Sequence, residues 1–178
     1  GIPTLIATLT ADGDSTLANT SAMTSAYDEY MFVFTDMHPA TNQVDFGFQV
    51  NVDGESGYNE TSQSTFWTAY HDETGGSSGH GYESTMDQAN GTGYNWLTAN
   101  TGSDNDQAMS GILHIFSPAD TTYVTHWVAR CNNYHSGDYT IDTFTHGYIN
   151  VTGAITDISF KFESGNIDAG VIQIYGIS

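Results

Sequence analysis

The sequence is almost devoid of basic residues. Arg130 and Lys161 stand against 21 acidic residues, which gives a formal net charge of −19 over 178 residues. Proteins bind nucleic acids largely by neutralising phosphates with lysine and arginine, so this composition argues against DNA or RNA as a partner. The same shortage argues against docking on an anionic membrane surface.

Long apolar runs are also missing. No stretch approaches the roughly 18 residues that span a bilayer, and Gly1 opens the chain without the regions of a signal peptide. We therefore expect a soluble chain. Its length suits one compact domain over residues 1–178, and its 11 Tyr, 9 Phe and 3 Trp supply a core that disordered chains lack.

Cysteine occurs once, as Cys131, so the chain has no internal disulfide and its fold depends on burial and hydrogen bonds. Cys131 ends a strand-like run, in which Arg130 points to the opposite face. A reactive thiol needs a cationic neighbour on its own side. The sequence therefore predicts that Cys131 is an inert core residue.

Alternation of apolar and polar residues is the dominant pattern, and it is typical of strands with one buried face. It is clearest over residues 46–52, where Phe46, Phe48, Val50 and Val52 share one side. About eight strands are predicted, at residues 30–35, 46–52, 64–71, 111–116, 123–131, 148–155, 158–163 and 171–175.

No window carries a helical stripe, so the class is all-β, most simply an antiparallel β-sandwich of the jelly-roll kind. The runs 158–163 and 171–175 are expected to form a closing hairpin that buries aromatic residues. Residues 72–108 are rich in glycine and polar residues and predict a long loop region, where partner contacts commonly lie. Residues 1–10 are a candidate extended arm, with Ile2, Leu5 and Leu9 as its assembly contacts.

Catalytic and metal-binding motifs are not recognisable. The seven histidines lack the spacings of zinc or iron sites, and no serine has the setting of a nucleophile. We therefore expect no enzyme and no resident cofactor. Calcium stays open because oxygen ligands suffice, with Asp104 and Asp106 as candidate ligands. A glycosidase also stays open as a minor alternative, with candidate carboxylates at Asp72, Glu73, Glu83 and Glu163.

Aromatic residues raise the question of sugar binding. Trp67 and Trp127 lie in predicted strands and are expected in the core. Tyr82, Tyr94 and Trp96 lie in the predicted loop region instead, where their rings could stack on glycans. The sequence therefore also predicts, as an alternative function, a carbohydrate-binding module that recognises host surface glycans with calcium as a candidate aid.

Four segments resemble a group of small virion structural proteins of marine tailed bacteriophages. They are residues 27–41 (YDEYMFVFTDMHPAT), 46–54 (FGFQVNVDG), 111–118 (GILHIFSP) and 158–177 (ISFKFESGNIDAGVIQIYGI). The resemblance implies a β-sandwich present in many copies on the virion surface, as a head decoration protein, head fibre or tail appendage. It implies no catalytic residues.

The expected function is accordingly non-enzymatic assembly. The partners expected are other virion proteins and further copies of the chain, in a homo-oligomer for which a trimer is predicted. The charge fits such a setting, because at the ionic strength of seawater the Debye length is about 4 Å and repulsion between exposed acids nearly vanishes.

Overall fold

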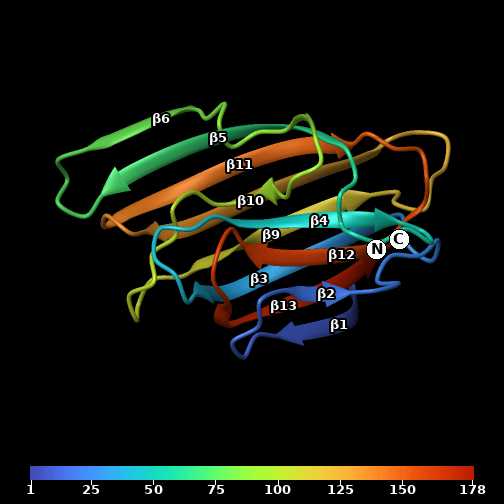
Figure 1. Ribbon diagram of the computed structural model, residues 1–178, viewed down its shortest axis with the longest axis horizontal. Helices are drawn as coiled ribbons and strands as arrows, with labels where there is room; N and C mark the ends of the chain where they lie inside the picture. The colour runs from blue at the N-terminus through green and yellow to red at the C-terminus, as the bar shows by residue number, and fades with distance from the viewer.

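The computed structural model describes residues 1–178 and contains thirteen strands and no helix (Figure 1). No segment therefore forms a helix capable of crossing a bilayer. The all-β prediction is confirmed, but about eight strands was too few. The jelly-roll connectivity stays a prediction.

The strands form two antiparallel sheets. The larger sheet has nine strands, in the spatial order β1 (Thr4–Thr10), β13 (Ile167–Ile177), β3 (Glu29–Pro39), β9 (Met109–Phe116), β10 (Thr125–His135), β11 (Tyr139–Ile149), β5 (Ser62–Asp72) and β6 (Ser78–Tyr82), with β7 (Ala89–Gly91) also paired to β5. The smaller sheet has four, in the order β2 (Leu17–Asn19), β12 (Ile155–Phe162), β4 (Phe46–Val52) and β8 (Asn95–Trp96).

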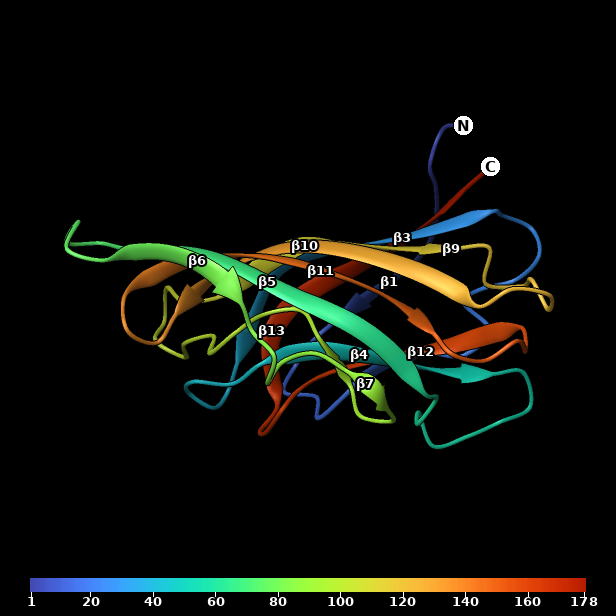
Figure 2. The ribbon, with the colours of Figure 1, turned by 90° about the horizontal axis from the view of Figure 1, so that it is seen from above.

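The two sheets lie face to face as a β-sandwich, with the smaller sheet covering part of the larger one (Figure 2). Both chain termini project on the side of the nine-stranded sheet that faces away from the smaller sheet. Gly1 lies directly against Ser178 there. The sandwich thus has one broad side that no second sheet covers.

Aromatic side chains from both sheets fill the core. Phe160 of β12 is fully buried, and its ring centroid lies 5.6 Å from Phe32, 5.4 Å from Phe34 and 6.1 Å from Phe46. Trp127 of β10 is buried as predicted. Its indole occupies the space opposite Gly147, where any added Cβ would lie 2.9 Å from the ring.

Two sequence-based details are wrong. The runs 158–163 and 171–175 do not form a hairpin: β12 belongs to the smaller sheet and β13 to the larger one, so the chain crosses the sandwich between them. Alternation reveals that each strand has one buried face, but it does not say which strand is the neighbour. The predicted strand at 148–155 combines the end of β11 with a loop at residues 150–154 and the start of β12. Within the predicted loop region 72–108, the structure has three short strands, β6, β7 and β8.

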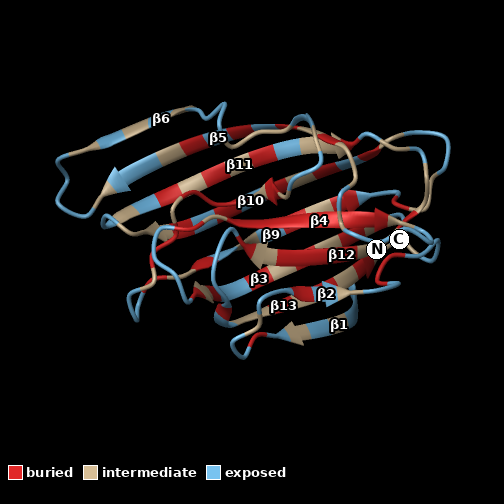
Figure 3. Ribbon diagram, in the orientation of Figure 1, coloured by how far each residue is buried: buried red, intermediate tan, exposed pale blue.

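The far side of the smaller sheet is covered by the chain itself. Gln49 and Ser159 point away from the core yet are buried. The Gln49 amide donates to the carbonyls of Glu60 and Gly93, both at 2.9 Å, and the Tyr94 hydroxyl donates to Ser159 Oγ at 3.0 Å. Strand β4 is therefore buried on both faces, as Figure 3 shows by its colour.

Candidate functional site

The side of the nine-stranded sheet that faces away from the smaller sheet, here called the outer face, is the broad uncovered surface of the molecule. Strand β10 illustrates it: Trp127, Ala129 and Cys131 are buried, whereas the alternating His126 and Arg130 are exposed. Successive side chains of a strand point to opposite faces, so each long strand contributes every second residue to the outer face.

Strand register arranges these residues in rows across the sheet. The first row is Leu5, Tyr175, Met31, His114, Val128, His146 and Thr65. The second row is Thr8, Gln173, Val33, Ile112, Arg130, Phe144, Trp67 and Tyr82. Neither row contains an aspartate or glutamate, so we call them the acid-free rows.

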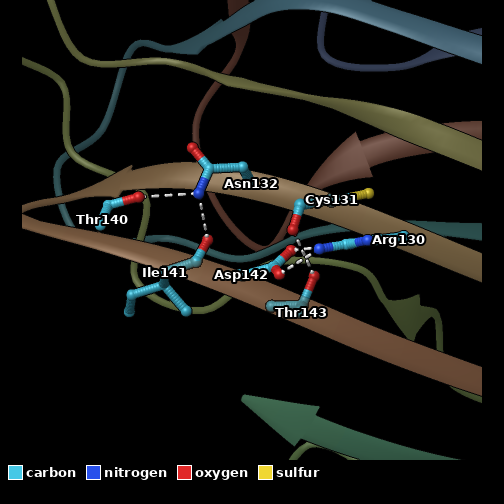
Figure 4. A network of polar contacts seen from close by, with 7 residues as sticks. All are labelled: Arg130, Cys131, Asn132, Thr140, Ile141, Asp142 and Thr143. Atoms are coloured by element: carbon cyan, nitrogen blue, oxygen red, sulfur yellow. Dashed lines mark hydrogen bonds and ion pairs between the residues drawn. The ribbon is translucent and has the colours of Figure 1, made fainter. Parts of the chain in front are cut away.

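Two acids beside these rows, Asp142 and Glu29, have side-chain hydrogen-bonding partners. Asp142 of β11 accepts from Arg130 through both carboxylate oxygens, at 3.3 Å from Nε and 2.8 Å from the terminal nitrogen (Figure 4). Hydrogen bonding to Asp142 raises the pKa of Arg130 above its ordinary value. Glu29 of β3 pairs with His114 at 2.5 Å. Arg130 thus balances the charge of Asp142, the acid that borders the groove on β11.

A shallow groove of about 700 Å³ runs over β9, β10 and β11 within this face. The Arg130 guanidinium lies 4.6 Å from the centre of the Phe144 ring, which forms one side of the groove. Asn132 lies on the polar side of the groove. Its side-chain amide donates to Thr140 Oγ1 at 2.8 Å and to a backbone carbonyl of β11. At the rim, the Asp36 carboxylate lies 3.5 Å from Ser110 Oγ. The groove offers apolar, aromatic and paired polar contacts side by side.

Cys131 lies beneath this groove and is buried, as predicted. Desolvation raises the pKa of its thiol to about 12, which keeps it protonated at neutral pH. The packing is tight, because a Cβ at Gly111 of the neighbouring strand would lie 2.5 Å from Cys131 Sγ. Cys131 therefore supports the sheet beneath the outer face.

The proposed assembly contacts at the N-terminus fall in three different environments. Residues 4–10 form β1, paired with β13 of the same chain, so the part of the expected arm beyond the sheet is residues 1–3. Ile2 is 91% exposed, and Leu5 lies on the outer face opposite Tyr175. Leu9 instead packs against the core.

Two of the three candidate glycan-stacking residues, Tyr94 and Trp96, lie together, whereas Tyr82 lies elsewhere. Tyr82 belongs to β6, at one edge of the larger sheet, and its hydroxyl donates to Asp87. Trp96 belongs to the smaller sheet, where its ring covers Gly47 and stacks on Tyr94 at 6.3 Å. Lys161 lies 4.5 Å from the centre of the Tyr94 ring. Tyr94 and Trp96 are thus partly buried, and their role in glycan stacking stays a prediction.

The candidate calcium ligands lie in an exposed turn. The backbone N–H of Gln107 donates to the Asp104 carbonyl at 2.8 Å, and the Gln107 side chain accepts from the Asp104 N–H at 3.0 Å. Asp104 and Asp106 are both exposed. No group of three or more His, Cys, Asp or Glu side chains is placed to hold a metal ion.

Sequence reasoning missed the main residues of the outer face. Trp67, expected in the core, is 43% exposed and stacks on His80 with ring centroids 5.6 Å apart. Ile112 and Phe144 were not singled out. The available signal was the alternation itself: Trp67 is out of phase with the buried Phe66 and Thr68 that flank it in β5.

Comparison with protein-family models, with curated proteins and with solved structures found no match.

Proposed function

We propose that this protein is a non-enzymatic structural component of a tailed-bacteriophage virion, present in many copies on the particle surface and bound there through its outer face. The pair of acid-free rows is the observation that carries the proposal. In a chain of net charge −19, most surfaces repel an acidic neighbour. These rows can approach another protein without that cost.

The size of the outer face supports an assembly role. Eight strands follow one another across the sheet, and at about 4.8 Å per spacing they make a face roughly 34 Å wide. Strands β9, β10 and β11 have 8, 11 and 11 residues, or about 26–36 Å of length. The resulting area, on the order of 1,000 Å², meets the roughly 800 Å² per partner of a stable protein interface.

The chemistry of the face also supports it. Ile112 and Phe116 of β9 are 38% and 37% exposed. Val128 of β10 and Phe144 of β11 are also partly exposed on this face. Interface centres are enriched in aromatic and apolar residues and depleted of charge. The resemblance of four segments to phage virion proteins points to the particle as the setting and to other virion proteins or further copies as the partners.

A glutamate in the second acid-free row should weaken this docking. Ile112→Glu places a second carboxylate beside Arg130, which already pairs with Asp142, so the centre of the face gains one net negative charge. We expect affinity for the particle to fall at least about tenfold, because a charge of the wrong sign in an interface costs several kcal/mol. The measurement is co-sedimentation with particles of the phage that encodes the protein. The particles are first stripped of this component, and the purified protein is then added back.

Ser56→Glu is the matched control, since Ser56 lies in an exposed loop and the substitution adds the same charge. It should bind particles like the wild type. Equal binding by the Ile112→Glu protein, or no binding of the wild type to heads or tails, would contradict the proposal.

Carbohydrate recognition is the second candidate function, and the exposed Trp67 ring favours it. Trp67 stacks on His80 and lies directly opposite Tyr82, forming an aromatic platform at one end of the second row. Aromatic faces bind sugars by stacking on their apolar C–H surfaces. The platform differs from the glycan site expected from the sequence. Only Tyr82 belongs to both, and Trp67 takes the place of Tyr94 and Trp96.

A glycan array with and without chelator separates the two functions. If the platform binds a host glycan, binding is saturable and Trp67→Ala removes it, whereas Tyr123→Ala, at an aromatic residue 72% exposed outside the rows, preserves it. Absence of saturable binding by the wild type retires the carbohydrate function. If the wild type binds without chelator and loses binding when chelator is added, calcium takes a direct part in glycan binding.

A further inference from the structure

Strand β1 forms an edge of the nine-stranded sheet, and its pairing with β13 is regular from Ala7 to Thr10, after a register shift between Leu5 and Ala7. Its sequence, TLIATLT, contains no charged residue and no proline, although the chain carries 21 acids. Ile2, Leu5 and Ile6 are 91%, 51% and 39% exposed. Natural sheets usually protect edge strands with charges, prolines or short length, because an open edge pairs with other strands.

The backbone of β1 has free hydrogen-bonding groups. The Ala11 N–H donates to the Gly170 carbonyl at 2.9 Å. This bond shows which residues of β1 have their backbone groups directed toward β13. Bonded and non-bonded pairs alternate in an antiparallel ladder, so the N–H and C=O groups of Thr8 and Thr10 point away from β13. They form a template for one more antiparallel strand.

The other edges of both sheets are better protected. Strand β6 has five residues, of which two are glycines, and it is followed by Glu83. Strands β2, β7 and β8 have three, three and two residues. Strand β1 therefore differs from every other edge in combining length, exposure and lack of charge.

We propose that β1 pairs antiparallel with β1 of a second copy of this chain, so that the two nine-stranded sheets become one continuous sheet. The partner strand must be extended, exposed at an edge, and free of the acids that make most surfaces of this protein repel one another. Strand β1 itself meets all three requirements, and two identical strands satisfy each other's free backbone groups.

This pairing has a defined geometry. Antiparallel pairing of identical strands gives a two-fold axis perpendicular to the sheet, so both outer faces lie on the same side of the dimer. In the register that pairs Thr8 with Thr8, the second acid-free row, which ends at Thr8, continues from one copy into the other. Edge pairing closes with two copies and thus predicts a dimer in place of the trimer expected from the sequence.

Two substitutions at Thr8 test the pairing. Thr8→Pro removes an N–H that points away from β13, and proline is tolerated at such edge positions. Thr8→Lys adds the charge that natural edges carry. In sedimentation in 0.5 M salt, we expect the wild type to be a dimer. Each Thr8 substitution should raise the dissociation constant of the dimer at least about tenfold.

Thr65→Lys is the matched control, because Thr65 is an exposed threonine of the outer face on β5, far across the sheet from β1. It should leave the dimer intact. Hydrogen exchange adds a local readout: the amides of Thr8 and Thr10 should be protected in concentrated wild-type protein and lose that protection on dilution. Unchanged thermal unfolding of the Lys variant verifies that its fold is intact.

A monomeric wild type at millimolar concentration, or dimers unaffected by both Thr8 substitutions, would overturn the edge pairing. Loss of the dimer in Thr65→Lys with retention in Thr8→Lys would assign it to the outer face instead. The inference stands on β1 alone, so its failure would leave docking through the outer face untouched, and Ile112→Glu would still test that docking separately.

Discussion

Replacing Phe160 by alanine is expected to lower the free energy of unfolding by about 4 kcal/mol, within the range of roughly 3–5 kcal/mol for large aromatic truncations in cores. The Phe160 ring is fully buried and contacts the rings of Phe32, Phe34 and Phe46. These residues come from both sheets, so the truncation opens a cavity at the point where the sandwich is held together. Equilibrium denaturation in urea measures the loss.

Phe116→Ala is the matched control, because Phe116 is 37% exposed on the outer face. It should cost clearly less than Phe160→Ala, because more than a third of Phe116 is already exposed to water in the folded protein. Phe160→Leu should lie between the two, as it keeps most of the buried volume. Equal losses for Phe160→Ala and Phe116→Ala would show that the sheets are not held together by this aromatic cluster.

Asp45→Asn is expected to stabilise the protein at pH 7 by up to about 3 kcal/mol. Burial, with a smaller contribution from nearby Glu163, raises the pKa of the Asp45 carboxyl from 3.8 to about 6, although the Asn100 N–H donates to it at 2.7 Å. The folded protein therefore binds a proton that the unfolded chain has lost, between pH 4 and 6. This contribution to stability is complete below about pH 4 and is lost as the pH rises through 6.

The asparagine keeps an oxygen that accepts the Asn100 N–H, and it carries no charge at any pH. Urea denaturation of both proteins from pH 4 to pH 7 should therefore give a stability difference that is near zero at pH 4 and grows until about pH 7. Asp53→Asn, at an exposed turn, removes the same charge without the burial. A constant difference across this range, or equal gains from both substitutions, would refute the role of burial at Asp45.

The fold class was predictable because apolar and polar residues alternate along many of the strands. In residues 46–52 and 158–163 the apolar residues alternate, and both runs are strands with buried aromatic rings. Strand β11 was not predicted as a whole because its inward positions include Thr143 and Thr145, which interrupt the apolar alternation. Thr143 is satisfied within the core, where its hydroxyl donates to the Leu97 carbonyl at 2.6 Å.

The candidate site was less predictable, because its residues are far apart in the sequence. Val33, Ile112, Arg130, Phe144 and Trp67 become neighbours only through the register of five strands. A single strand shows which residues share its face, but it does not show which rows they join in the sheet. The absence of acids from two complete rows is a property of the pairing.

The position of the two chain ends has a practical consequence for purification. Gly1 and Ser178 lie against each other, and both project on the outer side of the sheet, next to β1 (Figure 2). An affinity tag at either terminus would therefore shield the edge strand and reach over the neighbouring surface. Association should be measured only after a protease has removed the tag, because a monomer seen with the tag attached would reflect steric blockage.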